Sequence, residues 1–207
     1  MYKILDIEKW SRNDHFLFFS KFEEPFFGVT VRVNFTKAYN TSKSKGSSFF
    51  LYYLHASLKA ANSIEAFKYR IKNGQVLIYD KINASPTINR DNGTFGFSYM
   101  DYLEDFKEFE KSAKIEIEKV RNTTGLDPAG SGDNVIHFSS IPWIDFTSIS
   151  HARSFSFPDS CPKISFGQVI ESEGIKTMPV SIHVHHALMD AHHVGQFIEE
   201  FQKLLDR

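Results

Sequence analysis

Short stretches in which apolar and polar residues alternate predict several β-strands. In "EEPFFGVTVRVNF" the apolar positions from Val29 to Phe35 alternate with polar ones, as expected of a half-buried strand. The stretch "AFKYRIKNGQVLIYD" predicts two strands joined at Asn73-Gly74, a dipeptide that strongly favours a tight hairpin. We expect further strand material in "GTFGFSYMD", "VIHFSSIPWIDFTS", "PKISFGQVIESEG" and "KTMPVSIHVHH".

Apolar residues at helical spacing predict the helices. The stretches "GSSFFLYYLHASLKAANS", "YLEDFKEFEKSAKIEIEKVRN" and "AHHVGQFIEEFQKLLDR" have this spacing, and "DIEKWSRNDHF" predicts a short helix capped by its aspartate. Since helices and strands are interspersed, we expect an α/β fold in which helices pack on a mixed β-sheet. The polar loop "TTGLDPAGSGDN" is too short for an interdomain linker, so residues 1–207 are interpreted as a single domain.

Charge and cysteine content narrow the function classes. The 24 basic and 25 acidic residues leave a net charge of −1, which argues against a nucleic-acid-binding surface. The chain has one cysteine, Cys161, and it has no apolar run long enough to cross a membrane. Because "MYKILDIEKW" becomes charged too early for a signal peptide, we expect a cytoplasmic protein. Aromatic residues make up 15% of the chain, which favours an aromatic-lined pocket for a small molecule.

Histidines concentrate near the end of the chain, in "SIHVHHALMDAHHVGQF". His183 and His185 share one face of the predicted strand and could bind a metal, but no third ligand at a convincing spacing accompanies them. His186 follows where the strand ends, and a neutral imidazole there can accept a proton near pH 7. Asp190, four residues on, could be an acid partner, a helix cap or half of an ion pair. From these residues alone, polar side chains at the end of a strand are the favoured interpretation.

Four ordered motifs, taken together, resemble the chloramphenicol acetyltransferase family. "HVHHALMDAHHVGQFIEEFQKL" resembles its His-His-x-x-x-Asp-Gly signature and the following His-Val-Gly helix, a signature related to that of lipoyl acyltransferases. "WSRNDHFLFF" resembles the family's Trp-x-Arg-x-x-His-Phe segment, and "SSIPWIDFTSIS" its Pro-Trp-x-x-Phe-x-Ser segment. "PKISFGQVIESEG" resembles the Pro-x-Ile-Thr strand that precedes the signature. The resemblance covers almost the whole chain.

The resemblance implies a CoA-dependent acyltransferase fold, a two-layer α/β sandwich, and O-acetylation of chloramphenicol with acetyl-CoA as co-substrate and without a metal. His186 matches the family's general base, and Ser148 matches the serine that stabilises the oxyanion. Ser165 stands where the family has a threonine that holds a water molecule. Arg12 and Asp190 match a structural ion pair that braces the histidine loop, which would leave the other histidines as packing residues.

The resemblance also implies a homotrimer in which His186 of one subunit faces the acceptor pocket of the next. Phe18, Phe19, Phe95 and Phe97 are the expected acceptor-binding residues. Phe19 replaces a tyrosine and Phe97 a small residue, which puts the identity of the small-molecule acceptor in doubt. Ala191 replaces the signature's glycine and would be strained if that position needs a positive φ. Two alternatives therefore stay open: an acetyltransferase for another hydroxylated small molecule, and a trimeric relative that binds without catalysis.

Overall fold

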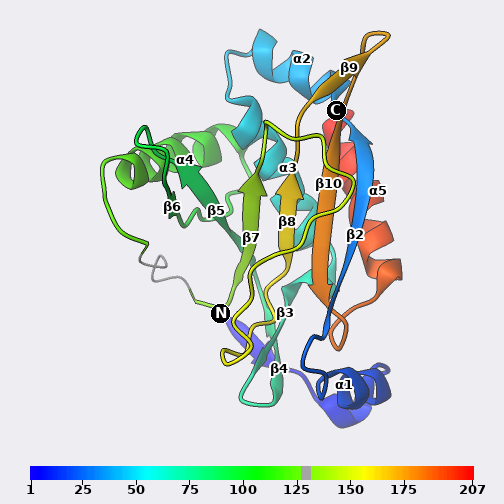
Figure 1. Cartoon of the computed structure of the whole chain (residues 1–207). Helices are drawn as coiled ribbons and strands as arrows, with labels where there is room; N and C mark the ends of the chain where they lie inside the picture. Colours follow the sequence, from blue (N-terminus) through cyan, green and yellow to red (C-terminus); the bar gives the residue numbers. More distant parts are fainter. Residues whose placement is uncertain (127–131) are drawn as a thin grey trace.

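The computed structural model describes residues 1–126 and 132–207 as a mixed β-sheet with helices packed on one face (Figure 1). The strand order in the large sheet is β2-β10-β8-β7-β5-β6, with β9 paired to β10. The strands of this sheet are β2 (Phe26–Asn34), β5 (Asn83–Asn89), β6 (Phe95–Phe97), β7 (Val135–Ser140), β8 (Lys163–Phe166), β9 (Ile170–Ser172) and β10 (Ile175–His185). The α/β class expected from the sequence is confirmed.

The helices cover one face of the sheet. In Figure 1, α3 and α5 lie behind β8 and β10, while the yellow-green segment between β7 and β8 crosses the front. The helices are α1 (Asn13–Phe19), α2 (Thr36–Ser44), α3 (Phe49–Ser63), α4 (Phe106–Arg121) and α5 (Ala191–Leu205), with 3-10 turns η1 (Ile7–Lys9) and η2 (Glu65–Lys68). Within the described residues, no helix is long and apolar enough to cross a membrane.

A small second sheet holds the predicted hairpin. Strands β1 (Tyr2–Ile4), β4 (Gln75–Tyr79) and β3 (Tyr69–Lys72) pair in that order. Asn73 and Gly74 connect β3 to β4 with φ values of 51° and 74°, the left-handed conformation that a two-residue type I′ turn requires. The hairpin prediction is therefore confirmed.

Several local expectations differ from the structure. The stretch "DIEKWSRNDHF" forms η1 and then α1 as separate elements, because the backbone of Trp10 between them is extended, and Asp6 makes no side-chain capping bond. The strand predicted from Val135 ends at Ser140, and the Pro-Trp segment after it is irregular. Residues 127–131 of the predicted polar loop lie outside the described residues.

Alternation along the central strands separates an apolar face from a polar one. On β10, Val180, Ile182 and Val184 are fully buried against the helices. The opposite face carries two rows of side chains that run across the sheet and are defined by strand register. The hydroxyl row consists of Thr30, Ser181, Ser165 and Ser139, and the basic row consists of His183, Lys163 and His137.

The segment between β7 and β8 covers these rows. Its His151 ring lies 4.8 Å from the His183 ring, edge to face. At the end of β8, a Cβ on Gly167 would lie 2.5 Å from Pro179 Cγ and 2.8 Å from the Ile144 carbonyl oxygen. Only glycine therefore allows this segment to approach the sheet so closely.

Candidate active site

His186 follows β10 directly, and its ring is held between aromatic side chains. The Phe19 ring stacks on it with a centroid distance of 3.9 Å, and the Phe27 ring lies 4.6 Å away. The backbone N–H of His186 donates to the Pro25 carbonyl at 2.8 Å. Its Nδ1 lies 3.3 Å from the Met189 carbonyl oxygen. Since a carbonyl can only accept, Nδ1 is the protonated nitrogen in this contact, and Nε2 is left free to take a proton.

An ion pair fixes the loop that carries His186. Arg12 Nη1 donates to Asp190 Oδ2 at 2.5 Å, and Arg12 Nη2 donates to the His186 carbonyl at 3.2 Å. Asp190 is also the N-cap of α5, where its Oδ1 accepts from the His192 backbone N–H at 3.1 Å and forms a capping box with His193. Partial burial opposes ionisation of Asp190, but the hydrogen bond and charge of Arg12 outweigh it and lower the pKa of the carboxyl to about 2.

An open hollow of about 580 Å³ exposes the His186 ring. It is lined by Asp14, His15, Phe18, Phe19, His186 and Asp190. The Phe18 side chain is 60% exposed at its edge. The hollow thus combines a candidate base with exposed aromatic surface, and two of the four expected acceptor-binding residues belong to it.

The predicted serines lie elsewhere. Ser165 is fully buried in the hydroxyl row, and its Oγ has no hydrogen-bond partner among the described residues. Ser148 is exposed in the irregular segment between β7 and β8. Ser139 was not predicted from the sequence; it is half-buried and directly opposite Ser165 in the β7–β8 register. Alternation along β7 could have revealed Ser139. The buried side chains of Ile136 and Phe138 point to the apolar face, so Ser139, next in the chain, points to the opposite face.

One chain does not bring the base and the hydroxyls together. Ser165 is in register with Ser181 of β10, and His186 follows five positions further along the chain. At about 3.3 Å per residue, this separation is roughly 16 Å, far more than one acetyl group can bridge. Phe95 and Phe97 lie still further away, on the edge strand β6.

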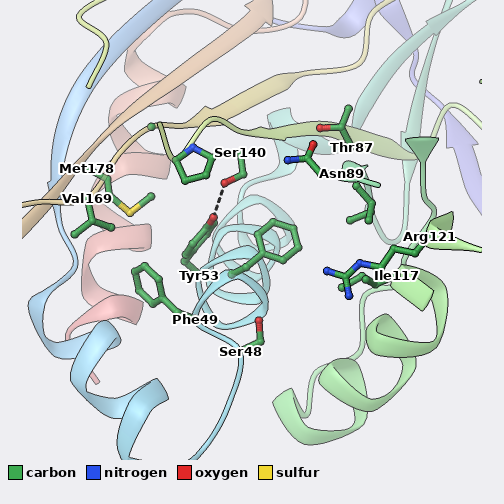
Figure 2. A pocket seen from close by; sticks show the side chains of 14 residues that line it. Ser48, Phe49, Tyr53, Thr87, Asn89, Ile117, Arg121, Ser140, Val169 and Met178 are labelled. Carbon is green, nitrogen blue, oxygen red and sulfur yellow. Dashed lines mark hydrogen bonds between the residues drawn. The ribbon is translucent and has the colours of Figure 1, made fainter. Parts of the chain in front are cut away.

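A separate cavity of about 460 Å³ opens between α3, α4 and the ends of the central strands (Figure 2). Its walls are mainly apolar, with Phe49 and Tyr53 from α3 facing Ile117 and Arg121 from α4. Tyr53 Oη lies 3.0 Å from Ser140 Oγ, and burial raises the pKa of Tyr53 to about 12. Ser140 directly follows Ser139, but the two side chains point to opposite faces of the sheet, so the cavity and the hydroxyl row approach the end of β7 from opposite sides.

The remaining histidines of the cluster have different surroundings: His185 is buried, His183 packs against His151, His193 takes part in the capping box of α5, and His192 is exposed. The His185 ring lies edge-on to Phe26 at 5.3 Å, on the opposite face from His186. Burial first, and then the charge of Arg153, lowers the pKa of His185 to about 4. Ala191 begins α5 and is not among the described non-glycine residues with positive φ, which are Asn73 and Glu173. The conditional expectation of strain at Ala191 is therefore wrong.

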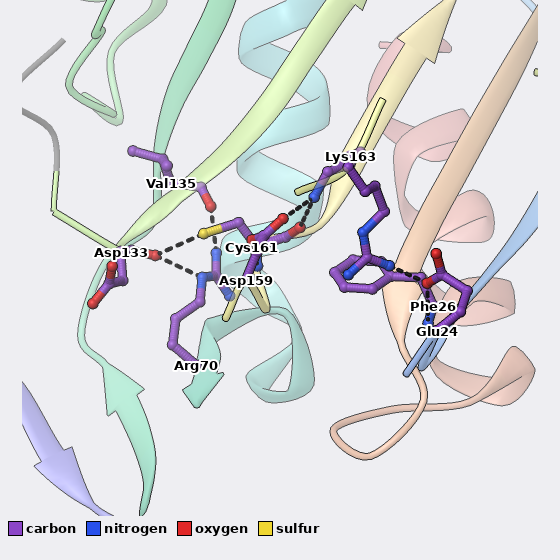
Figure 3. Close-up of polar contacts among 9 residues, drawn as sticks. Glu24, Phe26, Arg70, Asp133, Val135, Asp159, Cys161 and Lys163 are labelled. Atoms are coloured by element: carbon purple, nitrogen blue, oxygen red, sulfur yellow. Dashed lines mark hydrogen bonds and ion pairs between the residues drawn. The ribbon is translucent and has the colours of Figure 1, made fainter. Parts of the chain in front are cut away.

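One group of potential metal ligands occurs among the described residues, away from the histidine pair considered above. Ligand atoms of His137, Asp159 and Cys161 lie within 4.8 Å of one another. However, the Lys163 ammonium donates to the Asp159 carboxylate and already supplies the positive charge there (Figure 3). The expectation of a metal-free site stays a prediction.

Sequence comparison with known proteins points to the chloramphenicol acetyltransferases. The sequence profile described as chloramphenicol acetyltransferase matches residues 1–202. The chain is 26% identical to a chloramphenicol acetyltransferase of Klebsiella sp over 206 residues, 99% of this chain and 94% of the relative. It is 28% identical to one of Bacillus pumilus over 208 residues, 100% of this chain and 94% of the relative.

Solved structures extend the comparison. A chloramphenicol acetyltransferase structure superposes with a TM-score of 0.91 at 33% identity, covering 99% of this chain and 100% of the other. A truncated catalytic core of the 2-oxoacid dehydrogenase complex from Thermoplasma acidophilum superposes with a TM-score of 0.68 at 16% identity, covering 99% and 98% of the two chains. The second likeness shows the fold alone. From the first, and from the profile that spans nearly its whole length, the chain belongs to the chloramphenicol acetyltransferase family of acyltransferases.

Proposed function

We propose that the protein transfers an acetyl group from acetyl-CoA to the hydroxyl of a small-molecule acceptor, with chloramphenicol as the reference acceptor. His186 Nε2 accepts the proton of that hydroxyl, whose oxygen attacks the thioester carbon. The base then returns the proton as the CoA thiolate leaves. The hydrogen bond between Nδ1 and the Met189 carbonyl holds the tautomer that this role needs.

The separation of His186 from the hydroxyl row carries the second part of the proposal. Within one chain the base lies roughly 16 Å from the candidate oxyanion donors, so it can share an active site only with the donors of another subunit. We therefore infer that each active site lies between two copies of the chain in a homotrimer, with the hollow around His186 facing the hydroxyl row of its neighbour. Trp143, Phe155 and Phe157 are each at least 66% exposed on the segment covering that row, as interface residues often are in a free subunit.

The cavity between α3 and α4 suits the pantetheine arm of acetyl-CoA. Its apolar walls match the arm's alkyl portions, and Ser48, Asn89 and Ser140 offer hydrogen bonds to its amides. Arg121 lines the same cavity and can face the phosphates. The end near Ser140 would then direct the thioester towards Ser139 and Ser165.

Mixing two inactive variants tests the shared site. We expect His186→Ala to lower turnover about 10² to 10⁴-fold in a thiol-release assay with acetyl-CoA and chloramphenicol. The variant Ser139→Ala/Ser165→Ala should be impaired on its own. Co-expressed in equal amounts, the two chains assemble at random into trimers in which about one quarter of all interfaces combine an intact base with intact hydroxyls, and each hybrid trimer has one such interface.

Recovery of activity in the mixture, above the sum of the separate variants, supports the shared site. A mixture that stays inactive, although mass analysis shows hybrid trimers, would place the complete site within one chain. A solution mass near the 23.8 kDa of one chain, instead of three times that value, would contradict the trimer directly. His185→Gln is the matched control, because its ring lies on the opposite face and should affect turnover far less.

A further inference from the structure

Two neighbouring serines of the hydroxyl row do not bond one another. Ser181 and Ser165 are opposite in the β10–β8 register, and both side chains are fully buried. Residues in such positions have Cβ atoms about 5 Å apart, which is close enough for two serine hydroxyls to form a hydrogen bond. Yet Ser165 Oγ has no partner among the described residues. Another group must therefore occupy the Ser181 hydroxyl.

That group is His183, two positions further along β10 on the same face of the sheet. Ser181 Oγ lies 3.1 Å from His183 Nε2, and within residues 1–126 and 132–207 this imidazole is the one partner of that oxygen. A serine side chain has three staggered rotamers. The bond to His183 stabilises the rotamer that directs the Ser181 oxygen along its own strand instead of across to Ser165.

The surroundings of His183 fix its ring in this position. Gly28 is opposite His183 in the β2–β10 register, and a Cβ on Gly28 would lie 2.4 Å from the Cε1 atom of the ring. With any larger residue at position 28, the ring would have to move. The His151 ring also contacts it, edge to face, at 4.8 Å. Burial first, and then the charge of Lys163, lowers the pKa of His183, so the ring is neutral near pH 7.

Removal of the imidazole would change the bonding of both serines. A buried hydroxyl without a partner is unfavourable, and without His183 neither Ser181 nor Ser165 would have one among the described residues. The bond that remains open to them is the bond between the two hydroxyls. Ser165 would then turn towards β10, and its hydroxyl would already be occupied when the acyl group arrives.

We infer that His183 is a positioning residue of the acetyl transfer: it holds the Ser181 hydroxyl away from Ser165, and so leaves the Ser165 hydroxyl free to donate to the oxyanion. The inference rests on the proposed function, in which Ser165 is a candidate oxyanion donor. His183 acts through Ser181 and has no chemical step of its own. A donor whose bond is still unmade, in a site shielded from water, stabilises a developing negative charge without first giving up another partner.

Replacement of the imidazole tests the inference by kinetics. In the thiol-release assay with acetyl-CoA and chloramphenicol, we expect His183→Leu to lower kcat by about ten- to 10²-fold, below the 10² to 10³-fold loss typical of removing an oxyanion donor. The KM for acetyl-CoA should change little. His183→Gln should keep most of the wild-type kcat, because its amide can bond Ser181 in place of Nε2. His192→Leu makes the same change at an exposed histidine of α5 and is the matched control.

A second substitution separates positioning from a merely structural role. Ser181→Ala removes the hydroxyl that would otherwise occupy Ser165, so His183→Leu/Ser181→Ala should have a higher kcat than His183→Leu alone. Thr30 lies on the other side of Ser181 in the hydroxyl row, so His183→Leu/Thr30→Val should show no such recovery. An unchanged kcat in His183→Leu, or no recovery in the double variant with Ser181→Ala, overturns the inference and leaves the acetyl transfer intact.

Unfolding gives a readout that does not depend on activity. Ser165 Oγ makes no bond in the wild type, whereas in His183→Leu we expect it to bond Ser181. Ser165→Ala should therefore lower the midpoint of urea unfolding by more in His183→Leu than in the wild type. If the wild type releases no thiol with chloramphenicol, the proposed function fails, and this comparison decides whether His183 keeps the two hydroxyls apart. Equal shifts of the midpoint in the two backgrounds show that it does not.

Discussion

His186 and Ser165 depend on opposite kinds of environment. A base must keep one ring nitrogen accessible, and His186 does so at an open hollow, where stacking on Phe19 and the bond to the Met189 carbonyl fix its orientation. An oxyanion donor works best when it is shielded from water, because a dipole directed at a developing charge is stronger in a low dielectric. Ser165 is fully buried, which fits that requirement.

Ser148 and Ser139 are competing candidates for the main oxyanion donor. Loss of one such donor typically lowers kcat about 10² to 10³-fold. From the exposure of Ser148 and the pairing of Ser139 with Ser165, we expect Ser139→Ala to show a loss of this size and Ser148→Ala a much smaller one. Steady-state kinetics at saturating acetyl-CoA measure the kcat of both variants. A large loss of kcat in Ser148→Ala alone would support the oxyanion role of Ser148 that the family resemblance implies.

At the scale of elements, the first helix and the signature loop are joined by a single contact. Arg12 immediately precedes α1, Asp190 caps α5, and their ion pair holds the intervening His186 carbonyl as well. The ion pair therefore couples the position of α1 to that of His186, although Arg12 and Asp190 lie 178 positions apart in the sequence. This arrangement explains how a residue near the start of the chain can affect the base without contacting an acceptor.

The strength of this coupling can be measured with a double-mutant cycle. Arg12→Ala and Asp190→Ala should each lower the free energy of unfolding by about 1.5–3 kcal/mol, the range for charge-assisted hydrogen bonds. The Asp190 side chain is 34% exposed, so we expect less than the loss seen for fully buried pairs. The double variant should lose less than the sum, as judged by urea unfolding. Strict additivity would show that the two side chains stabilise the fold independently.

Phe97 lies on the edge strand β6, opposite Thr87 of β5. If it narrows the acceptor pocket of the neighbouring site, removal of the ring relieves overpacking of about 1–3 kcal/mol. We expect Phe97→Ala to lower KM for chloramphenicol roughly tenfold at an unchanged KM for acetyl-CoA. Ile115→Ala, which removes an exposed apolar side chain from α4 instead, is the control. An unchanged or higher KM for chloramphenicol in Phe97→Ala would remove this residue from the pocket.

The sequence predicts the elements whose local patterns are strong and misses those that depend on tertiary contacts. Alternation identified β2 and β10, helical spacing identified α3 and α5, and Asn73-Gly74 identified the hairpin. The sequence analysis did not predict β1, α2 or β5. For example, β5 contains Pro86 and pairs in parallel with β7, so its stability comes from a neighbour distant in sequence.

The candidate site shows the same limit. The motif containing His186 is contiguous, so position alone indicated the candidate base. The hydroxyl row is assembled from β2, β10, β8 and β7, and its members are ordinary strand residues in the sequence.

At the scale of the whole molecule, buried neutral histidines link the fold to pH. The pKa values of His137, His151 and His185 are lowered to about 4, chiefly by burial, whereas unfolded histidine titrates near 6.5. Between these values the unfolded chain binds more protons than the native one. Stability from these groups is therefore complete above about pH 6.5 and declines as the pH falls towards 4.

We accordingly expect the free energy of unfolding to fall between pH 7 and pH 5 by up to about 1.4 kcal/mol per pH unit for each histidine that stays neutral. Asp190 does not contribute in this window, because its pKa of about 2 keeps it ionised throughout. Urea unfolding at fixed protein concentration measures the slope, and His185→Gln should reduce it by removing one titrating ring from the protein's polar face. A free energy of unfolding that is equal at pH 7 and pH 5 would mean that these rings are already solvated in the native protein.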